Sequence, residues 1–206
     1  SRDLNVTQKT AWFMEHRIRE MLYENNPALL SNEVEVDETF IGGKNKNKHY
    51  SKRKPNTQGR SVVDKTPVIG LLERNGKLSI QVIENTKSES LIPVIKSVVK
   101  IDSNVFTDEW PGYNKLRKHY KHKIVNHGAN IYVLGNVHTQ NIEGFWSIFK
   151  RGIYGVYHQV SKKHLPRYCN EFCYRFNTRE VNSSERFNSV LKNANRRLSY
   201  RDLINA

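Results

Sequence analysis

Apolar and polar residues alternate along several short stretches of the chain in a way that predicts β-strands. The clearest stretch is 33–41, where valines and glutamates alternate until two glycines end the pattern. An Asn75-Gly76 pair lies between the next two stretches and is a strong signal for a hairpin. Further strands are predicted over residues 66–72, 77–83, 105–107 and 123–125.

A second spacing, with three or four residues between apolar positions, predicts helices. Thr7 is the expected N-cap of the first helix, whose apolar face would include Met14 and Ile18. Ser88 is the expected N-cap of the second helix. The strongest apolar face comprises Ile142, Phe145, Trp146, Phe149 and Ile153. Helices are predicted over residues 8–24, 88–100, 113–120, 139–153, 161–177 and 184–193.

The order of these elements predicts an α/β fold with a mixed five-stranded sheet flanked by helices and preceded by an N-terminal helix. Three antiparallel strands joined by short connections are followed by helices that alternate with strands. This order places the first strand in the middle of the sheet, with the fourth strand beside it. Residues 126–137 show neither spacing and are predicted to be irregular.

Charge adds a prediction about binding partners. The 206 residues include 34 Lys and Arg against 20 Asp and Glu, which gives a net charge of +14. Because phosphate neutralisation by basic side chains dominates nucleic-acid binding, DNA or RNA is the first candidate, and a generically basic protein is the alternative. The loop 44–60 is either a flexible insertion or a contact to backbone phosphates. Its basic residues are Lys44, Lys46, Lys48, Lys52, Arg53, Lys54 and Arg60.

Other classes of protein are not indicated. No apolar run is long enough to span a bilayer and no signal peptide opens the chain, so an intracellular location without membrane partners is expected. Cys169 and Cys173 are the two cysteines, and a disulfide framework is not predicted. We expect both to be small buried hydrophobes rather than metal ligands.

Three acidic residues are the candidates for chemistry. Asp37 and Asp108 each follow a β-branched run, and Glu143 begins the strongest helix pattern. Carboxylates brought together in this way suit a pair of Mg²⁺ ions, or Mn²⁺ in their place, and such ions catalyse phosphodiester chemistry. The alternative is that these acids are ordinary solvated groups, with Glu143 interacting only with the helix dipole.

Several longer motifs contain these acids: V-E-V-D-E-T-F-I-G-G, T-D-E-W-P-G-Y, H-T-Q-N-I-E-G-F-W-S-I-F-K-R-G-I and H-L-P-R-Y-C-N-E-F-C-Y-R-F-N-T-R. The chain from about Val6 to Arg179 therefore resembles the transposase domain of Merlin-type DDE elements and their bacterial insertion-sequence relatives. The resemblance implies a ribonuclease H-like fold. It also implies a metal-dependent DNA transposase that cleaves DNA at element ends and joins the resulting 3′-hydroxyl to target DNA.

The resemblance assigns Asp37 and Asp108 as the first two catalytic residues and metal ligands. The third is either Glu143 or Asn141, and we prefer Glu143 because it carries the charge that a cation site needs. Moreover, 34 residues separate it from Asp108, as in related DDE enzymes, and Lys150 follows two helical turns later. Lys150 and the neighbouring Arg151 are expected to contact DNA phosphates.

The expected organisation has three parts. Residues 1–30 form an N-terminal helix that is either the remnant of a helix-turn-helix or a packing helix. Residues 31–180 form the catalytic domain, and residues 181–206 form a helical and basic extension. Pairing of two DNA ends implies a homodimer or a higher oligomer, in the cytoplasm of a bacterium or the nucleus of a eukaryote. The alternatives are a nuclease without strand transfer and a transposase-derived DNA-binding protein.

Overall fold

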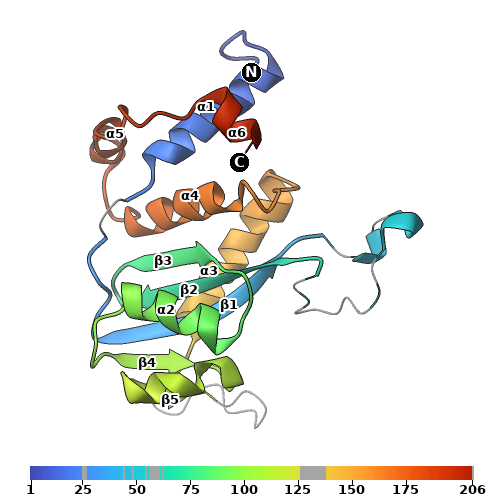
Figure 1. Ribbon diagram of the computed structural model, residues 1–206. Coiled ribbons are helices and arrows are strands. Elements are labelled where there is room, and N and C mark those ends of the chain that lie inside the picture. The colour runs from blue at the N-terminus through green and yellow to red at the C-terminus, as the bar shows by residue number, and fades with distance from the viewer. Residues whose placement is uncertain are drawn as a thin grey trace. The chain divides into compact units, whose positions relative to one another are not determined.

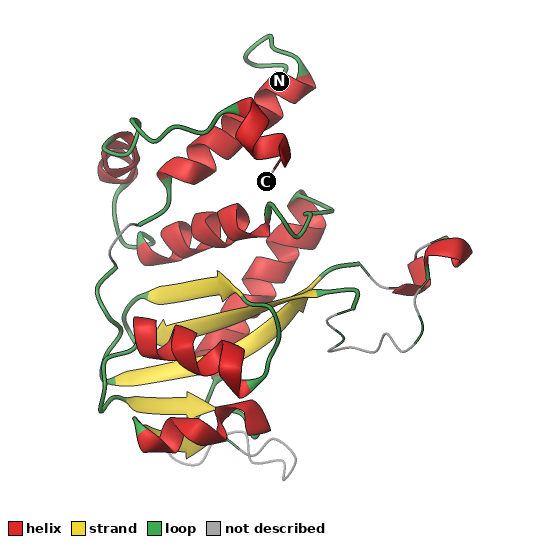
Figure 2. Cartoon of the chain, in the orientation of Figure 1, coloured by secondary structure: helices red, strands yellow, loops and turns green. Residues whose placement is uncertain are grey.

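The computed structural model describes residues 1–24, 27–43, 45–47, 49–53, 55, 61, 63–125 and 138–205. The chain divides into two compact units, one formed by Ala28–Lys162 and the other by Ser1–Pro27 together with Lys163–Ala206. The first unit contains the sheet and the second is helical (Figures 1 and 2). The predicted domain limits at residues 30 and 180 stay a prediction.

The sheet has five strands in the order β3-β2-β1-β4-β5. Strand β1 pairs antiparallel with β2 and parallel with β4, β2 pairs antiparallel with β3, and β4 pairs parallel with β5. This confirms the predicted mixed sheet, with the first strand in the middle and the fourth beside it. The strands are β1 (Glu33–Ile41), β2 (Thr66–Glu73), β3 (Leu78–Val82), β4 (Asn104–Thr107) and β5 (Lys121–Ile124).

The two faces of β1 meet different helices, because alternate side chains of a strand point to opposite faces. Val34 and Val36 are fully buried in the main hydrophobic core, together with Leu91 and Ile95 of helix α2 (Ser88–Val98). The opposite face of β1 contacts helix α3 (Gln140–Arg151). Figure 1 shows α2 and α3 on opposite faces of the sheet. Residues far apart in sequence are thus brought to one strand.

Two predictions about the region around α2 are wrong. Lys87 is the N-cap of α2 instead of Ser88, whose hydroxyl donates a hydrogen bond to the Gly112 carbonyl oxygen at 2.8 Å. Residues Pro111–Lys118 form the 3-10 helix η3 instead of an α-helix over 113–120. The buried Tyr113 and Leu116 explain this difference, since side chains three residues apart align on one face of a 3-10 helix.

Helix α3 buries four of the five apolar residues predicted for this face, and the fifth, Ile153, is buried in the turn that follows the helix. Gly70 of β2 lets the helix approach the sheet closely, because a Cβ at that position would lie 2.6 Å from Trp146 Cζ2. After Arg151 the chain continues as a π-helical turn over Gly152–Val156. The Tyr154 hydroxyl in this turn is 3.1 Å from the Gly42 backbone nitrogen and 3.2 Å from the Gly42 carbonyl oxygen. The predicted irregular segment 126–137 lies outside the described residues.

The helical unit contains four helices among the described residues. Thr7 caps the first helix as predicted, by accepting a hydrogen bond from the Thr10 backbone nitrogen. Cys169 is buried as expected, whereas Cys173 is only half-buried, so the expectation holds for one of the two cysteines. No described helix is long and apolar enough to cross a membrane. The helices are α1 (Gln8–Met21), α4 (Leu165–Asn177), α5 (Ser183–Leu191) and α6 (Tyr200–Asn205).

The predicted apolar face of α1 is wrong. Met14 and Ile18 are 38% and 52% exposed, whereas His16 and Arg19 are buried. Arg19 is buried because its guanidinium pairs with the Glu171 carboxylate of α4 at 2.8 Å. Helix α1 therefore packs through this ion pair and through the His16 ring, which contacts the rings of His164 and Tyr168. The spacing of apolar residues gives no signal for either kind of contact.

Candidate active site

Asp37 lies on β1, and Asp108 is the first residue after the neighbouring parallel strand β4. The register between β1 and β4 pairs Glu35 with Phe106, and each aspartate follows its strand partner by two residues. A step of two residues along a strand returns to the same face, so the two carboxylates belong to the same region of the sheet. Glu143 comes from the first turn of α3, the helix that contacts this face of β1.

The pKa of Asp37 reports how these acids interact. Burial, followed by the negative charges of Glu38, Asp108 and Glu143, raises this pKa from its usual 3.8 to about 7. A group whose ionisation is opposed by nearby like charges gains most from a positive ion in the same place. The acids predicted from the sequence therefore share one electrostatic environment, although 70 residues separate Asp37 from Asp108.

Each of the three acids is oriented by a protein donor. Trp146 Nε1 donates a hydrogen bond to Asp37 Oδ2 at 3.0 Å. The Trp110 backbone nitrogen donates to Asp108 Oδ1 at 3.0 Å, and Thr139 Oγ1 donates to Glu143 Oε1 at 2.9 Å. Trp146 thus connects α3 directly to the acid on β1, in addition to filling the core. The turn after β4 orients the Asp108 carboxylate through Trp110, and the N-cap residue of α3, Thr139, orients the Glu143 carboxylate.

The chemistry of these groups fits a hard divalent cation, which prefers carboxylate oxygen. Within the described part of the chain, no three acidic, histidine or cysteine side chains are arranged as a group that could hold a metal ion.

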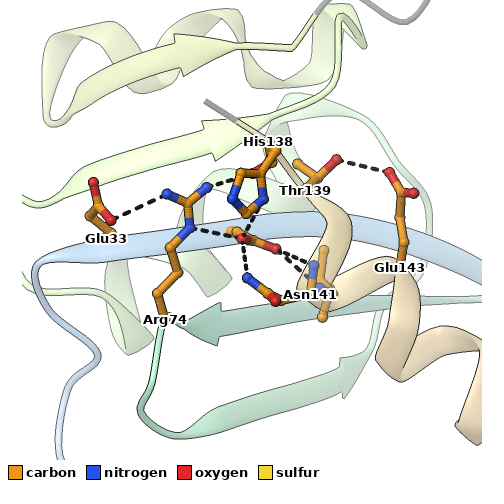
Figure 3. A network of polar contacts seen from close by, with 8 residues as sticks. Glu33, Arg74, His138, Thr139, Asn141 and Glu143 are labelled. Atoms are coloured by element: carbon orange, nitrogen blue, oxygen red, sulfur yellow. Dashed lines mark hydrogen bonds and ion pairs between the residues drawn. The ribbon is translucent and has the colours of Figure 1, made fainter. Parts of the chain in front are cut away.

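Asn141 and Glu143, the two candidates for the third position, have different surroundings. Asn141 Nδ2 donates to Glu35 Oε1 at 2.8 Å, and its backbone nitrogen donates to Glu35 Oε2 at 3.0 Å. Glu143 is exposed, accepts from Thr139 and contributes to the raised pKa of Asp37. Figure 3 shows the two residues on the same helix with different partners.

Sequence reasoning missed Glu35 and Arg74. The carboxylate of Glu35 is completely buried, and Arg74 Nε donates to it at 2.8 Å. Arg74 also donates to Glu33 at 3.2 Å and to the His138 carbonyl oxygen at 2.9 Å (Figure 3). The signal was present, since residue 35 shares its strand face with Asp37 and a helix had to cover that face.

A second buried acid lies beside Asp37 and points to the other face of the sheet. Glu38 is 9% exposed and accepts a hydrogen bond from the Tyr113 hydroxyl. Burial and the Glu38 carboxylate raise the pKa of Tyr113 well above its usual value, so the phenol stays protonated and donates. Glu38 supplies the largest charge effect on Asp37, and sequence reasoning missed this residue too.

The predicted DNA contacts are only partly within the described residues. Lys150 and Arg151 are exposed on α3, and Arg53 is exposed in the basic loop. Lys46 and Lys52 belong to the short 3-10 turns Asn45–Asn47 and Tyr50–Lys52. The remaining predicted contacts, Lys44, Lys48, Lys54 and Arg60, lie outside the described residues.

Known proteins similar to this chain are connected with DNA transposition. Over 108 residues, the chain is 31% identical to an uncharacterized transposase-like protein of Haemophilus influenzae, a match that spans 52% of this chain and 86% of that protein. It is 26% identical over 201 residues to an uncharacterized protein in the transposable element ISH50 of Halobacterium salinarum, which spans 93% of this chain and 68% of that protein. No solved structure matches the chain significantly.

A family assignment follows from the sequence profile of the ISXO2-like transposase domain, which matches residues 29–177. The match covers well over half of the chain, so the chain belongs to the ISXO2-like transposase family. The matched region includes all three candidate acids and both candidates for the third position. The closer relationship to Merlin-type elements stays a prediction.

Proposed function

We propose that this transposase cleaves DNA at the ends of a mobile element and joins the ends to target DNA, with Asp37, Asp108 and Glu143 as its catalytic residues. The observation that carries the proposal is the arrangement of the three acids, since β1 and β4 pair in parallel just before Asp37 and Asp108 and α3 hydrogen-bonds Asp37 through Trp146. The charges of Asp108 and Glu143 accordingly help to raise the pKa of Asp37. Acids from two strands and a helix gather in this way at sites where charge must be balanced by a ligand.

The three acids would hold Mg²⁺, with Mn²⁺ as a substitute. A divalent cation supplies activation of the attacking oxygen and charge neutralisation at the phosphate. Trp146 holds Asp37 toward α3, Thr139 orients Glu143, and the Asp108 carboxylate is fixed by the turn that follows β4. The protein contribution is thus to keep oxygen ligands from three elements in place.

The reaction proposed has two transfers at phosphorus. In the first, water attacks a phosphodiester at the element end, and the bond to the 3′-oxygen breaks to leave a 3′-hydroxyl and a 5′-phosphate. In the second, that 3′-hydroxyl attacks a phosphodiester of the target, which forms one new bond and releases one target 3′-hydroxyl. Lys150 and Arg151, both exposed on the helix that carries Glu143, would contact DNA phosphates beside the acids.

We also propose that the fold is ribonuclease H-like and that the active form is a homodimer or a larger assembly on DNA. The strand order β3-β2-β1-β4-β5, with three antiparallel strands followed by two parallel ones, supports the fold. The need to hold two element ends together supports the assembly.

The test is incubation of the purified protein with labelled element-end DNA, target DNA and Mn²⁺. Joined products are expected, and Asp37→Asn, Asp108→Asn and Glu143→Gln should each reduce them at least about 100-fold while binding persists. Asp102→Asn and Glu89→Gln are matched controls, because both acids are exposed and Glu89 also lies in the first turn of a helix.

The remaining outcomes distinguish the alternatives. Nicked DNA without joining would identify a nuclease, and binding without cleavage would identify a DNA-binding protein. Asn141→Ala compared with Glu143→Gln tests the third position. Full activity of Glu143→Gln would remove that residue from the proposed set.

A further inference from the structure

Helix α3 begins without a cap of its own. The first backbone N–H groups of any helix need partners from outside the helix, and the N-cap side chain usually provides one. Here the N-cap residue Thr139 makes no such bond, and its hydroxyl donates to Glu143 Oε1 at 2.9 Å instead. The first turn of the helix that carries Glu143 must therefore be satisfied by another part of the protein.

Glu35 of β1 provides those partners. Its Oε2 atom accepts hydrogen bonds from the backbone nitrogens of Asn141 at 3.0 Å and Ile142 at 3.1 Å. Its Oε1 atom accepts from Asn141 Nδ2 at 2.8 Å. A carboxylate at this end of a helix is also favoured by the helix dipole. One strand residue, distant in sequence, thus caps α3.

Arg74 keeps this buried charge balanced and in place. Its guanidinium donates to Glu35 Oε1 at 2.8 Å and lies 4.3 Å from the centre of the Phe106 ring, while another of its nitrogens donates to the His138 carbonyl oxygen just before α3. His138 Nδ1 is itself 3.3 Å from Glu35 Oε1. A buried carboxylate with several fixed donors has one orientation, because any rotation would leave donors unpaired.

We propose that Glu35 is a positioning residue that fixes the start of α3 on β1 and thereby sets the place of Glu143 relative to Asp37. Glu35 and Asp37 are two residues apart on one face of β1, which is about 7 Å along a strand. The amide of Ile142, which Glu35 holds, directly precedes Glu143. Trp146, bonded to Asp37 one turn later, adds a second tie between the same two elements.

This inference rests on the proposed function only where it concerns Glu143, and the capping itself is testable without catalysis. The variant Glu35→Gln keeps the size of the side chain but replaces one of its two accepting oxygens with an NH₂ group, which can only donate. That group faces donors of Arg74 or of α3, so part of the network must open. Glu33→Gln is the matched control, since Glu33 lies on the same face of β1 and shares Arg74, but its side chain is 33% exposed.

Three measurements are made on both variants and the wild type. Amide hydrogen exchange followed by NMR should be about 10-fold faster or more at Asn141 and Ile142 in Glu35→Gln, with Phe149 unchanged. The rate of strand cleavage should fall about 100-fold, as expected for a displaced catalytic group. The affinity for element-end DNA should stay within about two-fold, because Glu35 is completely buried and the proposed phosphate contacts Lys150 and Arg151 lie in the last turn of α3. Glu33→Gln should match the wild type in all three.

The outcomes separate the two proposals. Wild-type exchange rates at both amides in Glu35→Gln, or equal effects of Glu33→Gln, overturn the capping role. Faster exchange with an unchanged cleavage rate overturns the positioning role. A wild type that cleaves no DNA refutes the proposed function, whereas the exchange data still decide the cap. If Glu35→Gln does not fold, the wild type decides it: the Asn141 and Ile142 amides should exchange as slowly as amides in the middle of α3, and fast exchange refutes the cap.

Discussion

At the scale of single residues, Asp37 is a candidate acid whose ionisation is disfavoured by its surroundings. Its pKa of about 7 is above the value near 3.8 that it has in an unfolded chain. Between these two pH values the folded protein binds a proton that the unfolded chain has lost. The contribution of Asp37 to stability therefore decreases as pH rises from about 4 to 7, and each pKa unit corresponds to about 1.4 kcal/mol.

This linkage predicts that Asp37→Asn is more stable than the wild type at pH 8 in the absence of divalent cations. The gain should shrink as pH falls and vanish near pH 4, because the wild-type carboxyl is then protonated in both states. The Asn side chain can still accept the Trp146 hydrogen bond. Thermal unfolding at pH 4, 6 and 8 provides the measurement, with the exposed Asp102→Asn as control. A gain independent of pH would contradict this explanation.

At the scale of elements, α1 shows how a helix can be buried through polar groups. His16 is completely buried, and its ring is 4.9 Å from the His164 ring and 4.6 Å from the Trp12 ring. Burial, followed by the charges of Arg19, His164 and Arg167, lowers the pKa of His16 to about 3. The imidazole is therefore neutral in the folded helical unit and becomes charged on unfolding at mildly acidic pH.

We predict that the helical unit loses stability as pH falls from about 6.5 toward 3, because the unfolded chain then binds a proton that folded His16 does not. His16→Leu should reduce this pH dependence. His158→Asn is the control, since His158 is exposed and asparagine tolerates its positive φ of 58°. Hydrogen exchange of α1 amides between pH 7 and pH 4, corrected for intrinsic rates, provides the measurement. An equal dependence in His16→Leu would exclude His16 as the cause.

The basic loop is the second element with a measurable role. We predict that the double variant Lys52→Gln with Arg53→Gln flattens the plot of log affinity for DNA against log salt. The slope should fall by about 1 for each phosphate that the variant no longer neutralises, because fewer counterions are released on binding. Lys87→Gln with Lys100→Gln is the matched control, since both residues are exposed and flank α2 on the opposite face of the sheet from α3. An unchanged slope for the loop variant would remove it from the DNA interface.

At the scale of the whole molecule, the sequence predicts the sheet well and the polar interior poorly. Alternation in β1 and the hairpin signal at Asn75-Gly76 led to the correct strand order, because apolar side chains decide which faces are buried. Glu35 was placed on the polar side of the same alternation, although it is completely buried. The alternation shows only that Glu35 shares a strand face with Asp37, whereas its burial depends on Arg74 and on α3, which lies more than a hundred residues away.

The candidate site follows the same division. Asp37, Asp108 and Glu143 could be proposed from their strand and helix positions together with longer motifs. The choice between Asn141 and Glu143 could not be argued from contacts before the structure, because both residues lie in one helical turn. Which side of that turn meets Glu35 is decided by the packing of Trp146 against Gly70 and Asp37.

The cap on α3 also has a consequence during protein synthesis. A ribosome completes β1 long before it reaches α3, so the growing chain contains Asp37 and Glu35 without the helix that engages both. Until residues 140–151 emerge, Glu35 has Arg74 as a partner but lacks its donors from α3, and Glu143 has not yet been made. Under the proposed function, a growing chain that ends before α3 lacks the third catalytic acid and is therefore expected to be unable to cut DNA until that helix has been made.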